Sequence, residues 1–134
     1  MTCIRTAIIS LALLLAPQSV LALTQIASPD GRIVFSLDID EWGTPGYSVR
    51  YEDETVVSDS RLGLRFQSQQ GFDYRFSIID SQTGGADVTW EQPWGERRQV
   101  RDHHREMFVR FGDEAGRTFG IRVRVFDDGV GFRY

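Results

Sequence analysis

A strict alternation of apolar and polar side chains is the feature that most constrains how this chain folds. Residues 33–39, 47–51, 107–111 and 119–125 all place apolar side chains at every second position. A period of two puts successive side chains on opposite faces of a strand. Outside the N-terminal segment, no window shows the 3.6-residue apolar period of an amphipathic helix. The pattern predicts an all-β fold, and short strands with frequent turns predict an antiparallel β-sandwich.

Turn residues separate the predicted strands. Glycine and proline occur together at residues 28–31 and 43–46, which favours turns on either side of the strand at 33–39. The alternation also predicts strands over residues 61–67 and 73–78. At residues 127–129, Asp-Asp-Gly predicts a hairpin turn in which glycine supplies a positive φ.

The last predicted strand contains Val130, Phe132 and Tyr134 and ends with the sequence. A strand without its next neighbour exposes unpaired backbone groups at a sheet edge. We therefore expect a fragment, whose sandwich is truncated before completion.

Residues 1–22 have the features of a secretory signal peptide. Arg5 precedes an apolar run at 7–16, and small residues precede a cleavage position after Ala22. The run is shorter than the roughly 20 residues of a membrane-spanning helix. We expect a periplasmic or secreted domain over residues 23–134, with no membrane attachment after cleavage. Cys3 is the only cysteine, so this domain cannot rely on a disulfide.

The charge pattern argues against nucleic acid as a partner. The formal net charge is −4, and acidic residues and arginines are interspersed without a basic cluster. A phosphate backbone is bound through concentrated positive charge.

Trp90, Trp94 and Glu96 are the candidate carbohydrate-binding residues. An indole presents an apolar face and one N–H group, which suits either a sugar ring or a half-buried packing site. The two tryptophans therefore stack on sugar, or pack at the sandwich edge or against another domain. Glu96 binds sugar hydroxyls, or else pairs with Arg97 or Arg98 as a surface ion pair. A catalytic carboxylate pair of Glu91 and Glu96 is disfavoured, because nothing local sets their separation.

Asp102, His104 and Glu106 alternate onto one face of a predicted strand, so they could converge on a metal ion. The spacing alone is weak, and a solvated polar face is the favoured interpretation. His103 and His104 point to opposite faces of a regular strand, so they cannot share one site. We assign no metal ligand in this chain.

Three sequence blocks carry a resemblance to a known family. They are Asp87-Val-Thr-Trp with Trp94-Gly-Glu, then Asp102-His-His-Arg-Glu, then Asp127-Asp-Gly-Val-Gly-Phe-Arg-Tyr. In this order they resemble the N-terminal domain of glycoside hydrolase family 97, the bacterial α-glucosidases and α-galactosidases. Ser28-Pro-Asp-Gly and Leu62-Gly-Leu also fit. The chain departs from the family pattern at Val88, Asp102, His104 and Arg105.

The resemblance implies part of a β-supersandwich that continues beyond the Phe-Arg-Tyr step and precedes a (β/α)8 barrel. In the family that barrel carries the catalytic residues, and full-length members bind a calcium ion through glutamates. None of those glutamates matches a position here, so no catalytic residue and no cofactor is assigned to this chain. The partners implied are the missing C-terminal barrel and, through the full enzyme, an α-linked oligosaccharide.

Two functions follow from these features. The first is a non-catalytic N-terminal domain of an exported family 97 α-glycosidase, which supports the barrel, contributes to carbohydrate binding and is inactive alone. The alternative is a stand-alone secreted module that binds carbohydrate or protein, suggested by the tryptophans and by a signal peptide followed by one domain.

Overall fold

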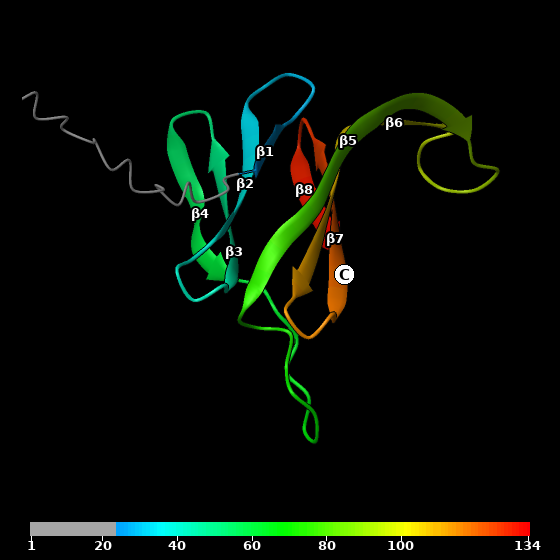
Figure 1. The fold of residues 1–134 in the computed structure, drawn as a ribbon. Helices are drawn as coiled ribbons and strands as arrows, with labels where there is room; N and C mark the ends of the chain where they lie inside the picture. Colours follow the sequence, from blue (N-terminus) through cyan, green and yellow to red (C-terminus); the bar gives the residue numbers. More distant parts are fainter. Residues whose placement is uncertain (1–23) are drawn as a thin grey trace, which may run out of the picture.

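A computed structural model describes residues 24–134, which form two antiparallel sheets packed face to face (Figure 1). The first sheet has the order β1 (Thr24–Ala27), β2 (Ile33–Ile39), β3 (Pro45–Tyr51) and β4 (Glu54–Arg61). The second has the order β5 (Phe76–Glu91), β6 (Gln99–Asp113), β7 (Thr118–Phe126) and β8 (Gly129–Arg133). The predicted antiparallel β-sandwich is confirmed.

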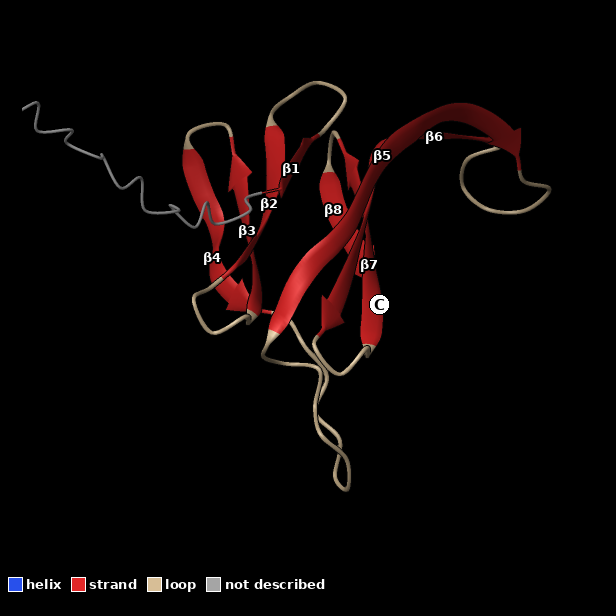
Figure 2. Cartoon of the chain, viewed as in Figure 1, coloured by secondary structure: helices blue, strands red, loops and turns tan. Residues whose placement is uncertain are grey.

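Strands and loops make up all of the described part of the chain (Figure 2). Residues 24–134 accordingly include no helix that could cross a membrane. The predicted signal peptide, residues 1–22, lies outside the described residues.

The core consists of the inward faces predicted by the alternation. Phe35 and Leu37 of β2 are fully buried, as are alternate residues of β6 and β7. Because successive side chains leave opposite faces of a strand, one apolar set per strand is enough to fill the space between the sheets. The buried apolar side chains are Ile26, Ile33, Phe35, Leu37, Leu62, Phe76, Met107, Val109, Phe111, Ile121, Val123 and Val125.

The predicted strand over 61–67 is wrong, because the chain leaves the sheet after Arg61. Leu64 forms only an isolated bridge with Phe72. Gly63, just before Leu64, has a φ of 150°. A Cβ on Gly63 would lie 2.8 Å from the Phe72 carbonyl oxygen. This close approach of two backbone segments makes a long loop over 62–75 instead of a strand.

The predicted strand over 73–78 begins only at Phe76. Arg75 adopts a positive φ of 62°, which no strand residue has. The N–H groups of Arg75 and Phe76 donate to the carbonyls of Trp42 and Gly43, at 3.0 and 2.9 Å. The start of β5 is therefore attached to the β2–β3 turn before it enters its own sheet.

The predicted hairpin turn between β7 and β8 is present, but its glycine has an ordinary strand role. Gly129 pairs with Phe126 as the first residue of β8, and it is not among the described glycines with positive φ. Asp127 Oδ1 accepts a 2.9 Å hydrogen bond from the Asp30 N–H in the β1–β2 turn. The aspartate therefore connects turns of the two sheets.

Candidate functional site: the arm of β5 and β6

The outer halves of β5 and β6 form a two-stranded arm that projects from the sandwich (Figure 1). The arm comprises residues 85–105, paired from Gly85 opposite Arg105 to Glu91 opposite Gln99. At its base, a Cβ on Gly85 would lie 2.6 Å from the His104 carbonyl oxygen. Only glycine permits this approach, and a glycine within a strand is typical of a bend.

The loop at the tip of the arm, residues 92–98, is closed by its own hydrogen bonds. The Gln92 N–H donates to the Arg98 carbonyl at 2.9 Å, and its side-chain amide donates to the Arg97 carbonyl at 2.7 Å. Gly95 has a φ of 120°. Because the loop closes on Gln92, the Trp94 side chain is left outside, with 81% of its surface exposed.

One face of the arm carries ion pairs. Asp87 accepts two 2.7 Å hydrogen bonds from the Arg101 guanidinium across the strands. These hydrogen bonds hold the pKa of Asp87 below its usual value. Near the tip, Arg98 lies 3.3 Å from Glu91. The charged side chains of these two pairs therefore bind one another across this face of the arm.

The opposite face of the arm carries apolar side chains near the tip, and Asp102 and His104 nearer the base. Val88 and Trp90 of β5 alternate onto the same face as Val100 of β6, which is paired with Trp90. Val88 is 56% exposed and Trp90 is 49% exposed. A projecting ribbon with exposed apolar side chains near its tip is typical of a docking element.

The structure brings the predicted carbohydrate residues to one end of the molecule, where Glu96 lines a cavity of about 670 Å³ that neither tryptophan lines. Trp90 lies on β5, and Trp94 and Glu96 lie in the tip loop. Neither tryptophan packs at the sandwich edge. Of the three roles considered for them, stacking on sugar and docking to another domain therefore remain. Arg98 pairs with Glu91 rather than with Glu96. A sugar-binding role for the three residues stays a prediction.

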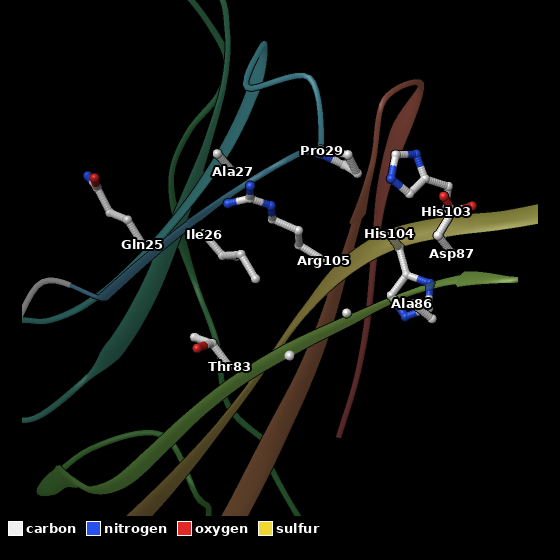
Figure 3. A pocket seen from close by; sticks show the side chains of 12 residues that line it. Gln25, Ile26, Ala27, Pro29, Thr83, Ala86, Asp87, His103, His104 and Arg105 are labelled. Carbon is white, nitrogen blue, oxygen red and sulfur yellow. The ribbon is translucent and has the colours of Figure 1, made fainter.

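A groove of about 690 Å³ lies where the arm leaves the sandwich, opposite β1 (Figure 3). The β1 side contributes Gln25 and Ala27, and the arm contributes Asp87, His103 and Arg105. Sequence reasoning missed this groove, because it depends on how far β1 reaches across the second sheet.

The face that holds Asp102, His104 and Glu106 is not the solvated surface that the sequence suggested. His104 is 5% exposed, and its ring lies 5.3 Å from that of Phe126 and contacts the Asp102 carboxylate through Nδ1. Large side chains of β7 cover His104 and Glu106, whereas Asp102 lies beyond the end of β7 and is 37% exposed.

Glu106 is held by two arginines of β7. Arg124 donates to its carboxylate at 2.8 Å, and Arg122 donates to the other oxygen. The Arg124 hydrogen bond, with the one from Arg122, lowers the pKa of Glu106. Charged residues alternate along both β6 and β7, and this pattern in the sequence could have indicated a charged cluster. Which of these charges meet depends on the register between β6 and β7.

Residues 24–134 do not provide a fit for the calcium ion that the family resemblance implies. No three His, Cys, Asp or Glu side chains gather there at metal-binding distances. The Glu106 carboxylate is occupied by its two arginines.

Family membership follows from a direct sequence comparison. The model of the family described as "Glycosyl-hydrolase 97 N-terminal" matches residues 26–134. The chain belongs to glycoside hydrolase family 97. The match covers all eight strands except the first two residues of β1, so the arm is part of the family 97 domain.

Solved structures place this family 97 domain within much larger enzymes. A family 97 enzyme from Pseudoalteromonas sp. strain K8, solved with acarbose and, as a variant, with panose, is 39% identical with a TM-score of 0.76. Each match covers 81% of this chain and 17% of the Pseudoalteromonas chain. A β-arabinopyranosidase gives a TM-score of 0.74 at 22% identity, which shows the fold alone.

Proposed function

We propose that this chain is the non-catalytic N-terminal domain of an exported family 97 α-glycosidase, in which the arm docks on the catalytic (β/α)8 barrel. The observation that carries the proposal is the exposed apolar pair Val88 and Trp90, beside the half-buried Val100, on a projecting ribbon. Family membership supports it, as does the 17% share of the related enzyme's length that the chain spans.

A two-stranded arm needs a second layer against which to pack its apolar side chains. A hairpin alone in water is marginally stable at best, because it has no second layer on which to bury an apolar face. The ion pairs Asp87–Arg101 and Glu91–Arg98 hold one face of the arm together, but they do not cover Val88 and Trp90 on the other. A barrel surface laid against the other face would remove Trp90 and Val88 from water, which stabilises both parts.

The isolated domain is expected to lack glycosidase activity. Glu91 and Glu96 line the same open cavity at the arm tip, but Glu91 is paired with Arg98, which leaves it acting as an ion-pair partner rather than as half of an acid–base pair. Purified 23–134 protein is tested with aryl α-glucosides and α-galactosides. Hydrolysis above a blank would contradict the proposal. Sequencing the gene past the Tyr134 codon completes the test, because a frame that continues into a barrel is required.

A second role for the same residues is contact with the oligosaccharide. The favouring observation is that Trp94 and Trp90 are 81% and 49% exposed, which leaves indole faces free to stack on sugar rings with Glu96 nearby. The Pseudoalteromonas enzyme was solved with the oligosaccharides panose and acarbose.

Export is the remaining part of the proposal, and it rests on the sequence of residues 1–22. We expect cleavage after Ala22 and delivery to the periplasm or beyond, as a signal peptide requires. Mass spectrometry of the N-terminus of the protein made in a bacterial host measures this directly. An intact Met1 on cytoplasmic material would rule out export.

A further inference from the structure

The outward face of the second sheet gathers arginines around a single glutamate. Cross-strand pairing places Glu106 of β6 opposite Arg124 of β7, and Arg124 opposite Gly131 of β8. In the next row, Arg122 of β7 lies directly opposite Arg133 of β8. The residues that alternate with the arginines along β7 are fully buried, so the arginines point away from the core. The three arginines and the glutamate therefore share one face of the sheet.

One carboxylate cannot balance three guanidinium groups. Arg124 donates a 2.8 Å hydrogen bond to Glu106, and Arg122 donates to the other carboxylate oxygen. Within residues 24–134, no acidic side chain forms an ion pair with Arg133. Three positive charges and one negative charge leave a local excess of two positive charges. The formal net charge of the chain is −4, so this excess does not reflect a generally basic protein.

The pairing of Arg122 with Arg133 is unfavourable without a counter-ion. Like charges directly opposite each other in an antiparallel pair are destabilising. An anion bound between the two guanidinium groups would replace this repulsion with two attractive contacts. Because such an anion binds the folded chain and not the unfolded one, it would stabilise the fold.

A cavity of about 280 Å³ lies among these arginines. Its lining consists of Arg122, Arg124, Phe126, Gly131, Phe132 and Arg133. A Cβ on Gly131 would meet no heavy atom within 4 Å, so the space above this glycine is open. The volume lies below the range of roughly 300–1,000 Å³ that is typical of pockets for drug-sized ligands. The cavity therefore suits a single charged group rather than a chain of sugar rings.

Two of the arginines are held in position by the protein itself. Glu106 binds both Arg122 and Arg124, and the Arg122 guanidinium also lies over the Phe108 ring, 5.1 Å from its centre. A guanidinium has several N–H donors, and Glu106 accepts from only some of them. A fixed fork of donors binds the oxygens of an anion with little further loss of side-chain freedom.

We propose that the arginine site, formed by Arg122, Arg124 and Arg133 around Gly131, binds a doubly charged oxyanion of the phosphate class. A phosphate group carries a charge of about −1.5 to −2 near neutral pH, which matches the local excess of positive charge. Its oxygens accept paired hydrogen bonds from guanidinium groups. A free phosphate ion and the phosphate ester of a sugar both offer this chemistry. The site requires neither the barrel nor glycosidase activity, so the inference is independent of the proposed function.

Thermal unfolding of the purified chain in inorganic phosphate tests the arginine site. Sodium chloride at the same ionic strength is the reference, because it screens charges without supplying a doubly charged oxyanion. At roughly ten times its Kd, phosphate is expected to raise the melting temperature by about 5 °C, since it binds only the folded state. Isothermal titration calorimetry provides the Kd.

Arg133→Gln is the variant that locates the binding. It is expected to weaken phosphate binding by roughly tenfold or more, because it removes charged donors to the anion. In sodium chloride the variant should melt at the same temperature as the unchanged chain or up to about 2 °C higher, because the repulsion with Arg122 is gone. Arg50→Gln is the matched control. Arg50 is exposed on β3 of the first sheet, so this substitution removes the same charge and should leave the Kd within about twofold.

A titration with a hexose 6-phosphate separates the two sources of the phosphate group. Binding more than roughly tenfold tighter than that of inorganic phosphate supports a site for a sugar phosphate, and weaker discrimination supports a site for the free ion. Absence of phosphate binding at about 10 mM would overturn the proposal. An unchanged Kd in Arg133→Gln, or a lower melting temperature of this variant in sodium chloride, would also overturn it. None of these results bears on the family 97 assignment, which the activity and gene tests address separately.

Discussion

Replacing Phe35 with alanine is expected to lower the unfolding free energy of the 23–134 chain by roughly 3–5 kcal/mol. Phe35 is fully buried in the middle of β2. Its ring stacks on Tyr47 at 5.5 Å and lies 6.3 Å from Phe132 of the second sheet. Truncation leaves a cavity where the two sheets meet, and close-packed neighbours fill such a cavity only in part. The loss is a large share of the 5–15 kcal/mol that a typical domain has.

Urea unfolding followed by circular dichroism measures this loss. Phe66→Ala is the control. This substitution removes a ring of the same size from the 62–75 loop, where Phe66 is 46% exposed. A loss of about 1 kcal/mol or less is expected there. Similar losses for both variants would show that β2 is not at the centre of the fold.

Replacing Trp94 with alanine is expected to act on the full-length enzyme and not on the isolated domain. In the 23–134 chain Trp94 is 81% exposed, so the stability should stay within about 0.5 kcal/mol of the unchanged chain. In the enzyme we expect Trp94 to be an anchor on the barrel. Pro93 restricts φ before it, and Gly95 adopts a φ of 120° after it, which aims the indole in one direction.

For a buried anchor, truncation should cost roughly 3–5 kcal/mol and lower the melting temperature of the enzyme by about 10 °C. The KM for an oligosaccharide should change little. Trp42→Ala is the matched control, because Trp42 is 70% exposed in the β2–β3 turn, away from the arm. An unchanged melting temperature with a strongly raised KM would instead assign Trp94, with Glu96, to the substrate.

The family and the fold class could be predicted from the sequence because both depend on local patterns. The alternation over 33–39 and 119–125 specifies which side chains face the core whatever the partner strand is. The blocks around Trp94, His103 and Phe132 resemble the family motifs as plain strings of residues. The hairpin turn at Asp127 also depends only on its neighbours in the chain.

Other features depend on residues far apart in the sequence, so only the tertiary structure decided them. The strand predicted over 61–67 became a loop because Gly63 lies against the Phe72 backbone. His104 is buried because the β6–β7 pairing places it beside Phe126. β8 is a sheet edge because the pairing order of the second sheet ends there. Strand periodicity determines which face of a strand is apolar, but packing between distant segments determines whether that face is covered.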